Sequence, residues 1–355
     1  MPTADHTVWM QRCLQLATLG AGRVAPNPMV GAVLVQGDNI LAEGWHHEFG
    51  GPHAEVECLR AFGDGPIPHG AILYVNLEPC AHHGKTPPCA ELLVTRGVKH
   101  VVIGQRDPFH AVAGKGIGIL GAAGLLVTED VLSDECRWIQ RRFLTSIEHG
   151  RPHIILKWAR SADGFLDQHP RTSRRVQRIS CPATDILVHR WRCEEQAILV
   201  GSRTVVNDDP SLTVRHVEGR QPLRVVIDRK AITPTNSSVY DDAAPTLLLT
   251  GKKRDDLRVE QHIVQVTEDP IAPLLKALHQ RTIRSVLVEG GAALLGHFIA
   301  RGLWDEARVI TGTARFGAGT PAPALKRKPV HTAKSGDDRI DMFTNGNTPC
   351  ASWDW

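Results

Sequence analysis

The chain has 355 residues, and at about 100–200 residues per domain this length predicts two domains. Its 42% hydrophobic and 22% charged residues are ordinary for a globular protein. The formal charge is only +3 and no broad basic footprint stands out, so we expect a small anionic ligand and no nucleic-acid partner.

The first half alternates strand-like and helix-like segments, which predicts a mostly parallel sheet covered by helices on both faces. Asp5 can cap a first helix that carries Trp9, Cys13 and Leu16 on one face. The glycine-rich stretch 114–118 follows no clear strand, and we interpret it as helix packing. Expected strands are 29–35, 40–45, 71–77, 98–103 and 125–127; expected helices begin near 53, pass through 90–93 and span 133–147.

A Gly-Arg-Pro sequence at 150–152 breaks the last of these helices and predicts a boundary between domains 1–148 and 149–355. The polar, arginine-rich segment 161–182 indicates a loop over a binding site. After Leu325 the chain is poor in apolar residues, although Trp353 and Trp355 suggest that its end packs down. Expected strands here are 154–158, 198–200, 224–227, 246–249, 285–288 and 308–310.

The eight cysteines are scattered along the chain, which favours free thiols with a metal site over a disulfide scaffold. Charged residues interrupt the N-terminal segment, and no apolar stretch approaches 18 residues. We therefore expect a cytoplasmic protein without a membrane partner.

His53, Cys80 and Cys89 form a candidate zinc site. One imidazole and two thiolates leave a fourth position for water, whose pKa zinc lowers to about 7. Glu55 is the candidate proton carrier, as in the His-x-Glu and Pro-Cys layout of zinc deaminases. A proline precedes each cysteine, so we expect both cysteines at helix N-termini, where free N–H groups favour a thiolate.

Two other interpretations of these residues remain open. His82 or His83 could complete a structural zinc site with four protein ligands. Alternatively, the cysteines could be core residues beside a surface His-Glu pair, with no metal.

Two stretches, HAEVE at 53–57 and LEPCAHHGKTPPC at 77–89, closely resemble the bifunctional riboflavin-biosynthesis deaminase/reductase family. PNPMVG at 26–31 and GWH at 44–46 are similar to its N-terminal motifs. In the second half, the resemblance extends to KWARSADG at 157–164, to 198–215 and to VEGG at 288–291.

The resemblance implies a cytidine-deaminase-like three-layer αβα domain followed by a dihydrofolate-reductase-like α/β domain. It implies zinc-dependent deamination of 2,5-diamino-6-ribosylamino-4(3H)-pyrimidinone 5′-phosphate, then reduction of the ribosyl group to ribityl by NADPH. We also expect a homo-oligomer. Two alternatives are a deaminase with a non-catalytic second domain and a deaminase that acts on nucleic acid.

Site residues follow from the same resemblance. Zinc would be bound by His53, Cys80 and Cys89, with Glu55 as proton carrier. The deamination substrate would meet Asn27, His46, His82 and Lys85. NADPH would contact Ala159, Arg178, Thr204, Asp208, Arg229, Gly291, Ala292, Ala293, Leu294, Leu295, Gly296 and His297. The reduction substrate would contact Lys157, Val176, Arg192, Leu212, Arg215 and Glu289.

Two positions depart from the family pattern. Ala81 replaces a serine that is common after the first cysteine, and Arg178 stands where the family usually has an aromatic residue. A cation at position 178 would suit the 2′-phosphate of NADPH.

Overall fold

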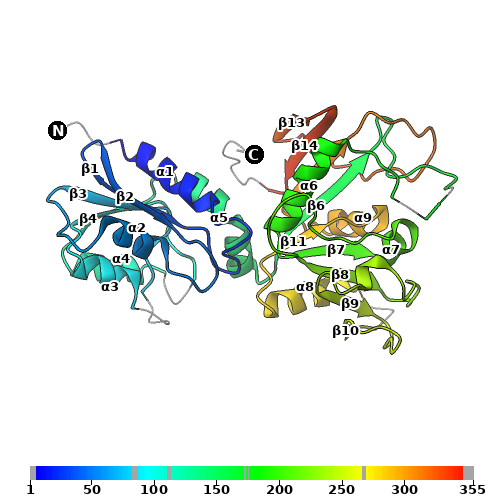
Figure 1. Cartoon of the computed structure of the whole chain (residues 1–355), viewed down its shortest axis with the longest axis horizontal. Helices are drawn as coiled ribbons and strands as arrows, with labels where there is room; N and C mark the ends of the chain where they lie inside the picture. The colour runs from blue at the N-terminus through cyan, green and yellow to red at the C-terminus, as the bar shows by residue number, and fades with distance from the viewer. Residues whose placement is uncertain are drawn as a thin grey trace. The chain divides into compact units, whose positions relative to one another are not determined.

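The computed structural model describes residues 5–81, 87–109, 113–171, 173–174, 176–265 and 269–346 (Figure 1). It divides the chain into two compact units that meet in sequence at Gly150 and Arg151. Each unit contains one sheet among its described residues.

The first unit begins with the expected helix, which Asp5 caps by accepting the N–H of Thr7 at 3.1 Å. Its elements are α1 (His6–Thr18), β1 (Gly31–Gln36), β2 (Asn39–Trp45), α2 (Ala54–Phe62), β3 (Ala71–Val75), α3 (Cys89–Thr95), β4 (His100–Ile103), α4 (Lys115–Ala122), β5 (Leu126–Thr128) and α5 (Ser133–His149). The glycine-rich stretch lies in α4, as expected.

The five strands follow the order β2-β1-β3-β4-β5. The sheet is mixed, because β1 runs antiparallel to both of its neighbours while β3, β4 and β5 pair in parallel. The expectation of a mostly parallel sheet therefore missed the direction of β1. A two-residue turn at Gly37 and Asp38 makes β1 and β2 a hairpin, which forces this direction.

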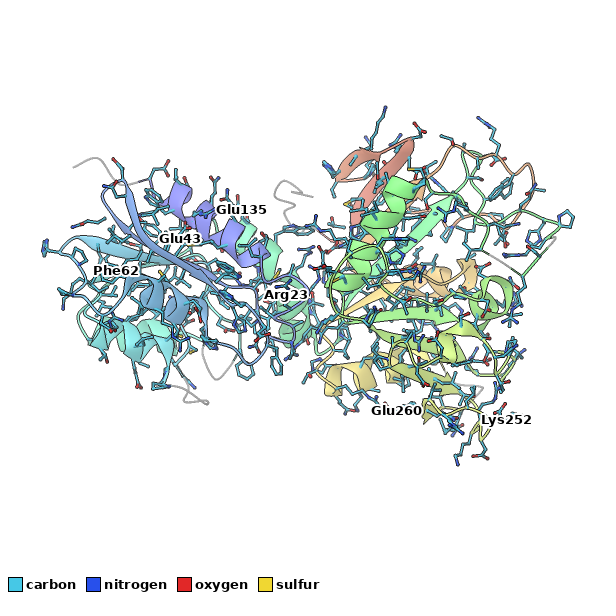
Figure 2. All side chains as sticks on the ribbon, in the orientation of Figure 1. Arg23, Glu43, Phe62, Glu135, Lys252 and Glu260 are labelled. Carbon is cyan, nitrogen blue, oxygen red and sulfur yellow. The ribbon has the colours of Figure 1, made fainter. Side chains whose placement is uncertain are left out.

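Helices cover both faces of this sheet, which gives three layers (Figure 1). Apolar residues of α2, α3 and α4 pack in one core with Leu34, Leu73 and Val101. Residues of α1 and α5 pack in a second core on the opposite face, with Val33 and Tyr74. An ion pair of 2.6 Å between Arg12 and Glu43 (labelled in Figure 2) also ties α1 to β2.

Gly44 lets α2 lie directly on β2. A Cβ atom at Gly44 would stand 2.2 Å from the Cys58 nitrogen and 2.7 Å from the Ala54 carbonyl oxygen, both in the backbone of α2. Because α2 begins at the zinc-ligand candidate His53, this close approach helps to set the position of the site.

The second unit is a larger α/β structure with a mostly parallel sheet in the order β10-β9-β8-β7-β11-β6-β12-β14-β13. Its elements are β6 (His153–Arg160), α6 (Pro182–Glu194), β7 (Ala197–Gly201), α7 (Ser202–Asp208), β8 (Leu223–Asp228), the 3₁₀ turn η1 (Ser238–Tyr240), β9 (Thr246–Thr250), β10 (Glu260–Ile263), α8 (Ile271–Gln280), β11 (Ser285–Val288), α9 (Ala292–Ala300), β12 (Glu306–Thr311), β13 (His331–Ser335) and β14 (Asp338–Thr344).

Helices α8 and α9 bury apolar residues against one face of this sheet. On the other face Trp191 of α6 packs under the guanidinium of Arg308 in β12, 4.9 Å from the ring centre. All six strands expected in this half are present.

Three strands were not expected from the sequence. Strand β10 is a polar edge strand, and its Glu260 (labelled in Figure 2) pairs with Arg281 just after α8. Strands β13 and β14 form a hairpin from the apolar-poor tail, in which Ile340 and Met342 are buried. Trp353 and Trp355 lie outside the described residues.

None of the helices in the described part of the chain is both long enough and apolar enough to cross a membrane.

The contact at Gly44 predicts a stability effect. Gly44→Ala should lower the free energy of unfolding of the first unit by about 1–3 kcal/mol, because the added methyl group overlaps the backbone of α2. Guanidinium unfolding followed by circular dichroism measures this change. Gly118→Ala in α4 is the matched control, since a Cβ there meets no atom within 4 Å and alanine favours a helix. Equal stabilities of the two variants would contradict the role of Gly44.

Candidate functional site

His53, Cys80 and Cys89 converge in the first unit, although they come from three segments. His53 is the N-cap of α2, Cys80 follows β3, and Cys89 is the first residue of α3. Their ligand atoms all lie within 4.8 Å of one another, and no other such group is found among the described residues.

The distances between these atoms fit a zinc ion. His53 Nδ1 lies 3.6 Å from Cys80 Sγ and 3.4 Å from Cys89 Sγ. Bond lengths of about 2.3 Å to sulfur and 2.0–2.1 Å to nitrogen, in a tetrahedron, place such atoms about 3.5 Å apart. The three residues are therefore arranged as ligands around one ion.

The two cysteines differ in their local structure. Cys89 begins a helix, as expected, but the expectation for Cys80 is wrong, because it lies in a loop. Cys80 Sγ nevertheless accepts the backbone N–H of Cys89 at 3.3 Å, so the N-terminus of α3 stabilises the Cys80 sulfur. A hydrogen bond with Cys89, opposed by burial and reinforced by His53, lowers the pKa of the Cys80 thiol to about 4.

Glu55 lies in the first turn of α2 and is only 3% exposed. Its carboxyl group interacts electrostatically with His53 and Cys80, which places it beside the three ligands. Burial raises the pKa of Glu55, while His53 opposes the shift. A carboxyl group with a raised pKa accepts a proton more readily than a free one, which suits a proton carrier.

Asn27 and His46 form a hydrogen-bonded pair next to this cluster. The His46 ring lies edge-on to His53, with 5.7 Å between ring centres. His46 Nδ1 donates to the Pro52 carbonyl at 2.8 Å, so Nε2 accepts from the Asn27 amide at 3.1 Å. Burial lowers the pKa of His46, which agrees with this neutral ring. His82 and Lys85 lie outside the described residues.

Gln140 and Asn76 hold the segment that carries Asn27, and sequence reasoning missed both. Gln140 of α5 accepts from the Met29 N–H at 3.0 Å and also donates to its carbonyl. Asn76 bonds to the same carbonyl and to the Gly31 N–H. Because these side chains take up the N–H and the carbonyl of Met29, those groups do not bond to a neighbouring strand. Strand β1 therefore begins at Gly31 rather than at residue 29.

Glu78 holds the loop that carries Cys80, and it was also missed. Its buried carboxylate accepts backbone N–H groups from Asp107, Gly114, Gly116 and Ile117, at 3.0–3.3 Å. These donors surround the start of α4, where a carboxylate is favourable. The Glu-Pro-Cys sequence at 78–80 was a signal for this residue, but its partners are not visible from sequence.

In the second unit, Glu289 lies at the centre of a charged cluster. Arg192 donates to both of its carboxylate oxygens, at 2.7 and 2.8 Å, and Lys157 Nζ lies 3.4 Å away. Burial alone would raise the pKa of Glu289, but Arg192 and Lys157 hold it well below its usual range. The carboxylate therefore stays ionised although it is buried.

Arg215 joins this cluster through Thr213. The Thr213 hydroxyl accepts from Arg215 at 2.8 Å, and its carbonyl accepts from Arg192 at 3.3 Å. The cluster thus brings together four of the expected substrate residues. Of the other two, Leu212 is buried with a positive φ of 54°, and Val176 is exposed.

The expected cofactor residues come from several segments of the second unit, and two of them are in direct contact. Thr204 and Gly291 belong together, because the Gly291 N–H donates to the Thr204 hydroxyl at 3.1 Å at the start of α9. Residues 292–297 continue α9, and the side chain of Leu295 is fully buried in the core. Ala159 lies at the end of β6, Asp208 ends α7 and Arg229 follows β8.

Three arginines of the 161–182 segment pair with carboxylates. Arg171 contacts Asp208, and Arg174 contacts Asp209 at 3.5 Å. Arg178, 67% exposed at its side chain, forms an ion pair with Asp185 of α6. Within the part of the chain that the structure describes, Arg178 has no hydrogen bond or ion pair with Thr204 or Gly291, so its expected contact with NADPH stays a prediction.

Comparison with known proteins finds matches to both halves of the chain. Residues 3–105 match the cytidine and deoxycytidylate deaminase zinc-binding region, and residues 152–340 match the RibD C-terminal domain. The riboflavin biosynthesis protein RibD of Bacillus amyloliquefaciens is 38% identical over 327 residues, covering 89% of this chain and 86% of that protein. For Escherichia coli RibD these values are 35%, 87% and 88%.

A solved structure extends the agreement to the fold. The diaminohydroxyphosphoribosylaminopyrimidine deaminase/5-amino-6-(5-phosphoribosylamino)uracil reductase of Thermotoga maritima superposes with a TM-score of 0.86, at 34% identity, covering 97% of this chain and 99% of that one. These matches confirm the expected fold class, the two activities, and zinc and NADPH as cofactors. The chain is therefore a member of the RibD family, the bifunctional deaminases and reductases of riboflavin biosynthesis.

Proposed function

We propose that residues 1–148 carry out the deamination and residues 149–355 the reduction, each with the residues that its cluster brings together. The arrangement of His53, Cys80 and Cys89 beside buried Glu55 carries the proposal for the first step. When bound by the three ligands, zinc supplies Lewis-acid activation of the attacking water.

Glu55 moves the proton in this step. It takes a proton from the attacking water and delivers it to the amino nitrogen, so that ammonia leaves and a carbonyl remains on the pyrimidine ring. Its position in the first turn of α2 holds the carboxyl group next to the ligands throughout. Asn27 and His46 orient the ring, and His82 and Lys85 complete the pocket, with Lys85 at the phosphate.

The second step takes place at the charged cluster of the second unit. NADPH supplies the hydride, and Thr204 and the Gly291 turn lie where backbone N–H groups at a helix start can bind its phosphates. Lys157, Arg192, Arg215 and Glu289 bind the ribosyl phosphate substrate, the arginines through its anionic group. Arg178 contributes to the cofactor site from the loop.

Three further points belong to this proposal. The protein works in the cytoplasm. It assembles as a homo-oligomer. A non-catalytic second unit is the competing hypothesis, and the reductase assay below decides between the two.

Glu55→Gln should lower the rate of deamination by about 10²–10⁴-fold, because the amide cannot carry the proton. Ammonia release measures this step, and NADPH oxidation with the deaminated substrate measures the other, which should not change. Zinc content should stay at about one ion per chain. A normal deamination rate would refute the role of Glu55.

Loss of one ligand should remove the metal and only the first activity. Cys89→Ser replaces a thiolate by a hydroxyl group that stays protonated at neutral pH, so zinc content and ammonia release should fall together by more than half. Cys136→Ala is the control, because Cys136 is buried in the core on the opposite face of the sheet. Full activity without zinc would overturn the metal assignment.

Arg192→Met should weaken binding of the deaminated substrate and so lower the rate of NADPH oxidation, while the rate of deamination stays unchanged. The change leaves the Glu289 carboxylate buried without its bidentate partner and removes a cation for the substrate. We expect KM for the deaminated substrate to rise about tenfold or more in an NADPH oxidation assay. If the unmodified protein oxidises no NADPH with this substrate, the second unit is non-catalytic.

A further inference from the structure

The short segment 213–215 of the second unit is held along its backbone by side chains. Arg192 donates to the Thr213 carbonyl at 3.3 Å. The Gln221 amide bonds to both the N–H and the carbonyl of Val214, at 2.8 and 2.9 Å. The N–H of Arg215 donates to Nδ1 of His189 at 2.9 Å. The path of this segment, and with it the starting point of the Arg215 side chain, depends on these contacts.

His189 is placed for this contact by helix α6. It lies three residues before Arg192, so both side chains project from the same face of the helix. The residue is 4% exposed, and its ring packs edge-on against His216 with 4.4 Å between centres. Because Nδ1 accepts a backbone N–H, the ring is neutral with its proton on Nε2. Burial, followed by the charges of Arg192 and Arg215, lowers the pKa of His189 to about 4, in agreement with this state.

We propose that His189 is a positioning residue of the reductase, which directs the guanidinium of Arg215 toward the anionic group of the substrate by holding the Arg215 backbone. This inference rests on the proposed substrate contact of Arg215. Among the described residues the guanidinium has one hydrogen bond, to Thr213, and Arg215 is exposed, so the direction of its side chain depends on where its backbone is fixed. An anchored arginine loses less freedom when it binds a phosphate.

The competing explanation is that His189 only fills space in the core. A space-filling role predicts a general loss of stability and activity. A positioning role predicts a selective effect on substrate binding that another acceptor in the same place restores.

The experiment compares three variants in the full-length protein. His189→Ala removes the acceptor, and KM for the deaminated substrate should rise about 5- to 30-fold, with KM for NADPH and the rate of ammonia release unchanged. His189→Asn should recover most of the loss, because the asparagine Oδ1 can accept the same N–H. Arg190→Ala is the matched control, since Arg190 is exposed on the same helix and pairs only with Glu194 among the contacts described.

A fourth variant separates this inference from the proposed function. Arg215→Met should raise the substrate KM at least as much as His189→Ala. If Arg215→Met has no effect, the substrate role of Arg215 is wrong. If Arg215→Met raises KM but His189→Ala does not, or if His189→Asn fails to restore it in a protein with an unchanged melting temperature, the positioning role of His189 is overturned.

Discussion

The deaminase site depends on two helices that begin at the same place. Helix α2 starts after His53 and helix α3 starts at Cys89, so two helix starts bring an imidazole and a thiol together. Cys80 has no helix of its own, but it accepts the first N–H of α3. Because zinc ligands must be deprotonated, this hydrogen bond favours the thiolate form of Cys80 in a buried site.

The two units use buried carboxylates in opposite ways. Glu55 is buried beside sulfur and imidazole, and burial raises its pKa, which suits a group that must gain and lose a proton. Glu289 is buried between Arg192 and Lys157, which keep its pKa low and its charge permanent. In the proposed mechanism the same side chain serves as a proton carrier in one site and as a fixed charge in the other, and its neighbours determine which.

In both sites, side-chain amides hydrogen-bond to the backbone of a loop residue, as a neighbouring strand would. Gln140 bonds to the N–H and the carbonyl of Met29 near Asn27, and Gln221 does the same for Val214 near Arg215. Glu78 collects N–H groups at the start of α4 in a similar way. An irregular segment is ordered when buried polar groups of its backbone are satisfied, so these contacts fix the loops that carry functional residues.

The sequence alone determined the features whose signals are local. Short patterns of proline, cysteine and helix-starting residues mark His53, Glu55, Cys80 and Cys89. The apolar strands of both sheets were predicted from runs of apolar residues, which are also local signals. The tertiary structure alone decided the antiparallel pairing of β1 with β3, the β13–β14 hairpin and the contacts of Gln140, Glu78 and His189. Gln140 and Met29 are 111 residues apart, and His189 and Arg215 are 26 apart. A hydrogen bond between such distant residues forms only once the chain has folded, and so it leaves no periodic pattern in the sequence.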